Sequence, residues 1–454
     1  MARAAWPAPW LLLWLAIGPL GCRSKRAPEG DAAKPSPTPS ASEISAPAPS
    51  EPAGRCREIG AGAGLRLGEP GPARPAATEG DAGEDADDDE TTLPFAASAG
   101  SAVALAGTFA VSAHASHGGT TEAFVGLVPA DGAVGRSVSL GRVHGDVPPP
   151  LLAGKDAVVF ALVPDSDAGG GMLRLARVDA VSAALGHGSE LTGVDHEVGA
   201  AIALGEGHGL IAWGARKSAH AGLRVVTFDL SEPKKFGGEL EVKGSAGAEA
   251  PDLVTRPGGF FLVWVAEEPP ADGGVPPIDG GALDQPLVAL GPRVLMALPL
   301  DAEGKPVGSP HAVSAKDSHV VGFDAAVLPD GALALAFRDD DTTPGVEGGA
   351  LHLARVGLDG AAELGRIEDE DLSVGLPSLL RDSTASGRVW VAVRSASDAA
   401  RVGVLAPNAL GVESLAGDAL LRGADVLAAG AGKLLVSRSR GRALELDVLE
   451  CQPK

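Results

Sequence analysis

Six aromatic residues recur along this chain at a nearly fixed interval, and each lies inside a short apolar run. They are Phe109, Phe160, Trp213, Trp264, Phe337 and Trp390. The successive differences are 51, 53, 51, 73 and 53 residues. Apolar residues alternate along the runs, and Gly, Asp and Pro separate them, which is the pattern of short half-buried strands. The sequence therefore predicts repeated β-sheet units of about fifty residues each.

A second repeated segment supports the same period. The related segments LRLARVDA, from Leu173, and LHLARVGLDG, from Leu351, lie in phase with the aromatic positions. A period near fifty that is carried by short strands resembles β-propeller blades, and the resemblance covers about residues 56–454. The repeats lack the Gly-His…Trp-Asp signature of WD-repeat propellers and the Ser-x-Asp-x-Gly-x-x-Trp boxes of sialidase-like ones. The resemblance therefore implies a fold and no functional family.

Counting the units predicts how the ring closes. Six full units extend from about residue 95 to 424, and the tail 426–451 supplies three strands of another. A fourth strand is available in the segment 56–68, and pairing it with the tail would remove both free sheet edges. We predict an all-β fold, a single propeller of seven blades with four antiparallel strands each, with six or eight blades as alternatives. The 73-residue gap is explained by a Pro/Gly-rich insertion, 267–292, between strands of the fourth unit.

Two of the three cysteines lie at opposite ends of the predicted ring. Cys56 and Cys451 would fall on adjacent strands of one blade if the ring closes as described. In an oxidising envelope compartment such an isolated pair is most simply a disulfide. The alternative is two unpaired buried thiols. Neither a CxxC motif nor a Cys/His cluster indicates a zinc site.

The N-terminal segment 1–22 has the features of an export signal. A short basic start leads into an apolar run from about Trp10 to Leu20, which is short for a membrane span. The run ends Leu20-Gly21-Cys22 and resembles a bacterial lipoprotein signal peptide, a resemblance that implies cleavage before Cys22 and lipidation of its thiol. Pro19 and the basic residues just after Cys22 depart from that motif. An uncleaved anchor and plain secretion are the alternatives.

Two low-complexity segments flank the start of the predicted ring. Residues 23–54 are rich in Pro, Ala and Ser and have almost no large apolar residues, so we expect a disordered, semi-extended tether. Residues 69–93 carry a run of Asp and Glu, for which we expect a solvated disordered loop. A loose calcium-attracting patch is the alternative, although the spacing matches no cation-binding loop.

The charge of the chain excludes one class of partner. The formal net charge is −22, and the sequence has no basic region that could neutralise a run of phosphates. Nucleic acid is therefore not an expected partner. The lipid anchor would make the membrane a partner, a protein in the cell envelope is a second candidate, and no cofactor is expected. The localisation that follows is exported and membrane-anchored, on the periplasmic or cell-surface side of the inner or outer membrane.

Polar residues recur where one unit ends and the next begins. These residues are His144, Asp146, Asp195, His196, Glu197, Asp252, Asp317 and His319. Such crossovers lie on one face of a propeller, and side chains that converge around the channel could ligate a divalent cation or bind a cationic ligand. The alternative is that exposed turns are polar and that Asp side chains cap them.

No catalytic signature is present. The chain has no GxSxG, HExxH, P-loop or EF-hand motif, so no catalytic residue is assigned. The recurring tryptophans could form a sugar-stacking surface, but their repeated strand position favours packing between blades. We predict a non-enzymatic binding or scaffolding module. The alternative is a hydrolase, a lyase or a metal-dependent binder that uses His and carboxylate groups on the channel face. Convergence of His144, His196 and His319 would favour that alternative.

Overall fold

The chain divides into two compact units, Met1–Pro52 and Ala53–Lys454, and the second is the subject here. The computed structural model describes residues 56–59, 65–67, 96–117, 120–167, 170–215, 222–267, 291–340, 349–367, 375–382, 387–394, 399–440 and 443–452. The predicted signal peptide, tether and acidic segment 69–93 lie outside the described residues, as does most of the insertion 267–292. Among the residues described, no helix is long and apolar enough to cross a membrane.

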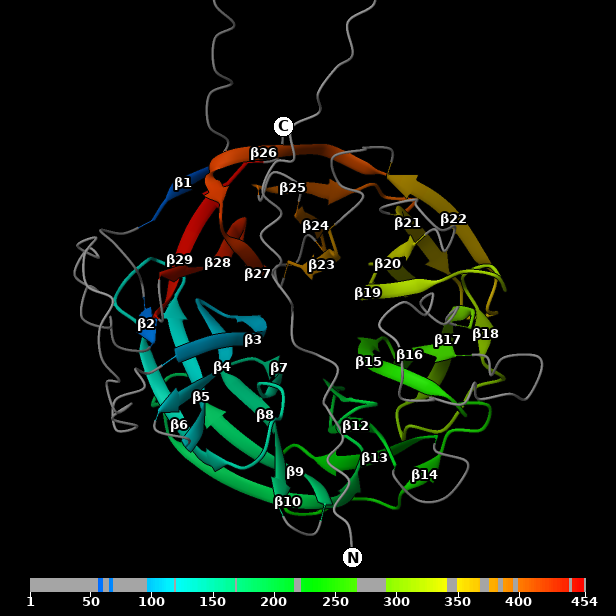
Figure 1. The fold of residues 1–454 in the computed structure, drawn as a ribbon, viewed down its shortest axis with the longest axis horizontal. Coiled ribbons are helices and arrows are strands. Elements are labelled where there is room, and N and C mark those ends of the chain that lie inside the picture. The colour runs from blue at the N-terminus through cyan, green and yellow to red at the C-terminus, as the bar shows by residue number, and fades with distance from the viewer. Residues whose placement is uncertain are drawn as a thin grey trace, which may run out of the picture. The chain divides into compact units, whose positions relative to one another are not determined.

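The described strands form seven antiparallel sheets arranged as the blades of a β-propeller (Figure 1). Blades 1 to 3 are built from β3 (Ala96–Leu105), β4 (Thr108–His117), β5 (Thr120–Pro129) and β6 (Arg136–Val143); β7 (Leu151–Lys155), β8 (Val158–Asp167), β9 (Gly170–Asp179) and β10 (Leu185–Val194); and β11 (Ala200–Leu204), β12 (His208–Gly214), β13 (Leu223–Asp229) and β14 (Leu240–Glu241). The all-β, seven-bladed prediction is confirmed.

The remaining blades follow the same order. Blades 4 to 6 are built from β15 (Ala248–Arg256), β16 (Gly259–Glu267), β17 (Arg293–Asp301) and β18 (His311–Ala312); β19 (Val320–Val327), β20 (Leu333–Asp340), β21 (Gly349–Val356) and β22 (Ala362–Ile367); and β23 (Pro377–Arg381), β24 (Val389–Arg394), β25 (Ala399–Leu405) and β26 (Val412–Arg422). In each blade the first strand along the chain lies nearest the ring centre and the fourth lies at the rim (Figure 1).

The seventh blade closes the ring with strands from both ends of the described chain. It contains β27 (Asp425–Gly430), β28 (Lys433–Arg440) and β29 (Ala443–Cys451), and its outer edge is supplied by β1 (Cys56–Glu58) and β2 (Leu65–Leu67). Both N-terminal strands pair antiparallel with β29. The single closing strand that the sequence predicts is therefore two short strands on one partner.

A disulfide crosslinks this closure. Cys56 faces Cys451 in the register between β1 and β29, and their Cα atoms lie 4.1 Å apart. The two sulfurs are bonded, which confirms the predicted pair over the alternative of free thiols. Both residues are buried among the apolar side chains between blades 6 and 7.

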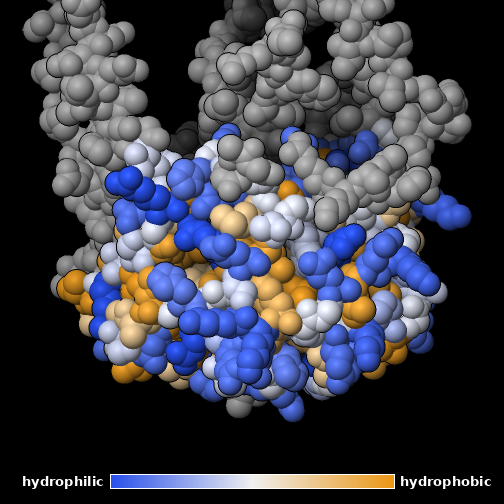
Figure 2. All heavy atoms as spheres, turned by 90° about the horizontal axis from the view of Figure 1, so that it is seen from below, coloured by the Kyte–Doolittle hydropathy of each residue, from blue (hydrophilic) through white to orange (hydrophobic). Residues whose placement is uncertain are grey.

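The core consists of apolar clusters that fill the gaps between neighbouring blades. One cluster lies in each of the seven gaps, including the gap between blade 7 and blade 1. The six periodic aromatic residues are all at most 2% exposed and belong to these clusters. Blade packing therefore accounts for the aromatic period, and the buried tryptophans cannot form a surface for sugars. On the face that Figure 2 shows, polar and apolar side chains are interspersed.

Candidate functional site

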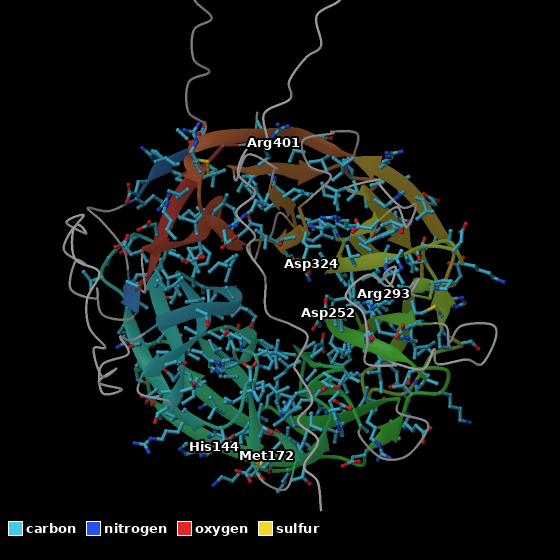
Figure 3. All side chains as sticks on the ribbon, in the orientation of Figure 1. His144, Met172, Asp252, Arg293, Asp324 and Arg401 are labelled. Atoms are coloured by element: carbon cyan, nitrogen blue, oxygen red, sulfur yellow. A yellow bond between two sulfur atoms is a disulfide. The ribbon has the colours of Figure 1, made fainter. Side chains whose placement is uncertain are left out.

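The first junction brings His144 against a buried aspartate that the sequence pattern did not single out. The backbone N–H of His144 donates to Asp165 Oδ1 at 2.8 Å, and its Nδ1 lies 3.0 Å from the same oxygen. Asp165, near the end of β8, is 4% exposed, whereas the side chain of His144 is largely exposed. His144 therefore caps the end of a neighbouring strand, and Figure 3 places it toward the outer part of the ring.

Two further side chains converge on Asp165. Arg174 Nε lies 3.2 Å from Asp165 Oδ2, and His196 Nε2 lies 2.7 Å from the Asp165 carbonyl oxygen. Burial acts to raise the pKa of Asp165, but hydrogen bonds from His144 and the charge of Arg174 outweigh it and lower the pKa below its ordinary value. The cluster therefore holds an ionised carboxylate, and it joins the crossovers on either side of blade 2.

The same backbone arrangement recurs in blade 5. The N–H of His319 donates to Asp339 Oδ1 at 2.6 Å, and the His319 carbonyl accepts the N–H of Asp340 at 3.2 Å. The corresponding carbonyl of His144 accepts the N–H of Ser166 at 3.1 Å. This repetition identifies the junction histidines as caps on second strands of blades. His319 serves blade 5 and is not a member of the cluster at Asp165.

Most of the other junction residues are exposed or belong to turns. Asp146, Glu197 and Asp317 are exposed, and Asp195 accepts the N–H of Glu197 at 3.1 Å in a tight turn. In the part of the chain that the structure describes, no group of three or more His, Cys, Asp or Glu side chains is arranged to hold a metal ion. Of the two junction residues that Figure 3 labels, Asp252 lies beside the channel and His144 lies toward the outer part of the ring.

A central channel of about 740 Å³ is lined by the inner strands of all seven blades. Its wall is made largely of small and aliphatic residues, among them Ala102, Ile202, Leu253, Leu380 and Ala428. These strands are the inner edges of their sheets, so their channel-facing backbone groups have no partner strand. Side chains at the channel margin can satisfy some of these groups.

Asp324 on β19 accepts a hydrogen bond from such a backbone group across a blade boundary. Its Oδ2 accepts the N–H of Leu379, on the inner strand of blade 6, at 2.8 Å, and its Oδ1 accepts the N–H of Ala325 at 2.8 Å. Ser101 makes the equivalent bridge from blade 1, where its hydroxyl accepts the N–H of Leu152 at 2.7 Å. A polar side chain at this strand position therefore links one blade to the next.

Asp252 on β15 occupies the matching position of the preceding blade. Each aspartate is in the middle of its inner strand, and both lie at the channel margin in Figure 3. Asp252 Oδ1 accepts the N–H of Leu253 at 2.7 Å. Burial raises the pKa of Asp252 to about 6. Burial, and then the nearby charge of Asp252, raise the pKa of Asp324 to about 7.

The two aspartates nevertheless keep partial contact with solvent, and the residues that follow them, Leu253 and Ala325, line the channel. Asp324 could have been found in the sequence by aligning the strand–turn segments PDLVTRPGG and FDAAVLPDG, which place both aspartates the same distance before the turn. The structure therefore places Asp324, which the sequence pattern did not single out, near the predicted residue Asp252.

Two cationic side chains, those of Lys155 and Arg256, are among the groups that line the channel. Lys155 Nζ donates to the carbonyls of Gly205, at 2.9 Å, and Glu206, at 2.6 Å. The guanidinium of Arg256 donates to three carbonyls, and its Nη2 reaches that of Leu300 at 2.9 Å. Both cations line the channel where the inner strands end. Glu206 and Asp382 line the channel as well, so its charged lining residues are of both signs.

Comparisons with known proteins show the same architecture. No protein-family model matches the chain, and no curated protein matches it. The polysaccharide lyase Uly1 aligns with a TM-score of 0.50 at 11% identity, covering 87% of this chain and 98% of that one. The β-propeller domain of the Trilobed protease from Pyrococcus furiosus aligns with a TM-score of 0.47 at 11% identity, covering 79% and 95%. At such identities the likeness shows the β-propeller fold alone.

Proposed function

We propose that this protein is an exported lipoprotein whose β-propeller serves as a non-enzymatic binding or scaffolding module in the cell envelope. The observation that carries the export step is the Cys56–Cys451 disulfide, because disulfides persist in oxidising compartments outside the cytosol. The sequence Leu20-Gly21-Cys22 supports lipidation, and the segment 23–54 would separate the anchor from the ring.

The binding role is supported by how the ring uses its polar residues. The junction groups of His144 and His319 bond to Asp165 and Asp339 and thereby hold strand ends in place. These bonds give a rigid frame whose turns are displayed on both faces. Binding residues are commonly carried by loops on such a frame. We therefore assign the ring to recognition of a protein in the envelope.

The lipid anchor is tested by labelling. The full-length protein, expressed in a bacterium supplied with radiolabelled palmitate, should incorporate label and remain in the membrane fraction. Cys22→Ala should lose the label and be released, because the acylated thiol is gone. Cys56→Ser, in which Cys22 is intact, is the matched control and should keep the label. Label that persists in Cys22→Ala would contradict the lipoprotein proposal.

Partner binding is tested separately by crosslinking in intact cells. A photoreactive residue at Val134, whose side chain is 88% exposed in a turn of blade 1, should give a discrete adduct of fixed mass with a protein partner. The same probe at Phe109, which is buried between blades, should give none. The full experiment places such probes one at a time at exposed turns of all seven blades. If no position gives an adduct, the binding proposal is contradicted.

A further inference from the structure

The N-terminal segment enters the ring at one particular face. Cys56 pairs with Cys451, and the N–H of Cys451 donates at 3.4 Å to the carbonyl of Gly432, in the turn between β27 and β28. In a four-stranded antiparallel blade, the turn between the first two strands and the turn between the last two lie at the same end. Cys56 therefore lies at the face that carries these turns, which we call the turn face. The crossovers between blades lie at the opposite face, the crossover face.

Large apolar side chains are exposed on the turn face. Of the seven such side chains that are exposed among the described residues, four lie in turns between the third and fourth strands of different blades. These four, the turn tips, are 50–88% exposed and are Val134, Val181, Leu358 and Val307. Exposed turns are mostly built from Gly, Pro, Asn, Asp and Ser, so turn formation does not account for these aliphatic side chains.

Hydrogen bonds connect two of the tips to the blade that receives the N-terminal segment. Lys433 Nζ, beside the turn between β27 and β28, donates at 2.7 Å to the carbonyl of Ala130, in the turn that carries Val134. Arg136, which follows that turn, donates through Nη2 at 3.1 Å to the carbonyl of Ala180, next to Val181. The tips of blades 1 and 2 therefore belong to the same face as Cys56.

The turns that carry the tips hold little of the net charge of the chain. The turns between third and fourth strands are 130–135, 180–184, 230–239, 302–310, 357–361 and 406–411. They contain five acidic and three basic residues, whereas the whole chain has a formal net charge of −22. A surface of zwitterionic lipid headgroups would therefore meet little electrostatic repulsion from these turns.

We propose that the turn face docks on the membrane that holds the lipid anchor, with the turn tips inserted among the lipid headgroups. This inference rests on the proposed lipoprotein. The segment between Cys22 and Cys56 ends at the turn face, so the anchor keeps this face near the bilayer at a high effective concentration. A few aliphatic side chains then suffice, because interfacial binding increases with the apolar area that is buried.

Docking through the turn face restricts how a protein partner approaches the ring. The crossover face points away from the bilayer and stays open to the aqueous phase. A partner that is captured by a probe at Val134 is then a protein embedded in the same membrane, because Val134 is one of the turn tips.

Fluorescence quenching by brominated lipid tests the docking. The lipidated protein is reconstituted into vesicles of phosphatidylcholine whose acyl chains are either brominated or unbrominated. Single variants place a tryptophan at a turn tip, Val134→Trp or Val307→Trp, and the wild type, whose blade tryptophans are buried, gives the background. Each tip variant should fluoresce at least about twofold less in the brominated vesicles, because inserted side chains reach the boundary of the acyl chains. Leu376→Trp, at the crossover face, is the matched control and should be unaffected.

A second set of variants is needed because tryptophan itself favours membrane interfaces. In the protein that carries Val307→Trp, the added changes Val134→Asp and Val181→Asp should abolish the quenching, because charged tips resist insertion. Val321→Asp, at the crossover face, should leave the quenching unchanged.

The outcomes separate this inference from the proposed function. Protein that does not float with the vesicles would overturn both the lipid anchor and the docking. Protein that floats, but whose tip tryptophans are quenched no more than the tryptophan of Leu376→Trp, would overturn the docking alone. Quenching that survives Val134→Asp and Val181→Asp would also overturn it.

Discussion

The backbone N–H of His144 and the carboxylate of Asp165 form a hydrogen bond of 2.8 Å that ties the crossover before blade 2 to the second strand of that blade. The bond from His319 to Asp339 repeats it in blade 5. Each crossover passes from the rim to the ring centre, and these bonds fix it to the blade that it enters. Two predicted ligand residues are thus explained as parts of the frame.

Replacing Asp165 by Asn should destabilise the protein by about 1–3 kcal/mol at neutral pH. The Asn amide cannot form an ion pair with Arg174, and the partly buried guanidinium would lose its charged partner. Because the pKa of Asp165 is lowered in the folded state, its contribution is present above the unfolded pKa of about 4 and is lost as the pH falls through the folded value.

Urea denaturation of Asp165→Asn and wild type across pH measures this contribution. Asp146→Asn, on the same crossover but exposed, is the matched control and should stay within about 0.5 kcal/mol of wild type. A difference between Asp165→Asn and wild type that grows toward low pH would contradict the assigned role.

Replacing Asp252 by Asn should have the opposite effect and stabilise the protein at about pH 8 by roughly 1–3 kcal/mol. The pKa of Asp252 is raised to about 6 in the folded state, so ionisation costs stability there. The wild type is therefore most stable, relative to the variant, below the unfolded pKa of about 4 and loses stability as the pH rises through about 6.

The same substitution should also lower the pKa of Asp324, because it removes the charge of Asp252, which helps to raise that pKa. Denaturation curves at several pH values and NMR titration of the aspartate carboxyl carbons check both statements. Asp317→Asn serves as the control for loss of one surface charge. A stability difference that is constant between pH values of about 4 and 8 would refute the coupling.

Removing the disulfide with Cys56→Ser and Cys451→Ser should lower the urea midpoint substantially. The bond spans a sequence separation of 395 residues, for which the chain-entropy estimate is on the order of 5 kcal/mol. Reduction of the wild type should reproduce the effect, whereas the reductant should leave the double variant unchanged. An unchanged midpoint on reduction of the wild type would show that the crosslink does not stabilise the ring.

The architecture could be predicted because each blade has to fill the gap to its neighbour with apolar side chains in the same way. Every second strand needs a bulky residue for the gap beside it, so Phe109 and Trp390 mark equivalent positions in distant blades. Counting strands then leaves the last blade one strand short, and the segment that begins at Cys56 can supply that strand beside the one that ends at Cys451. Division of the closing strand into β1 and β2 left no signal, since both are three residues long.

The candidate site could be predicted only in part. Polarity at the junctions is visible in the sequence, but the distance of each junction residue from the ring centre is not. His144 follows an outer strand and therefore stays near the rim, whereas Asp252 is already part of an inner strand. Asp165 and Asp324 stand inside apolar strands, where a single carboxylate does not change the strand pattern. Their partners come from adjacent segments that only the folded ring brings together.

The crosslinked closure also determines where the ring carries mechanical load. Tension along the chain from its N-terminal side enters the ring at Cys56, at the start of a strand of three residues. Hydrogen bonds of so short a strand would peel apart one after another under such a pull. The covalent bond instead passes the force to Cys451 at the end of β29, which is paired along its length with β28. A ring held by its N-terminal end is thus pulled at a long, fully paired strand as well as at the short one.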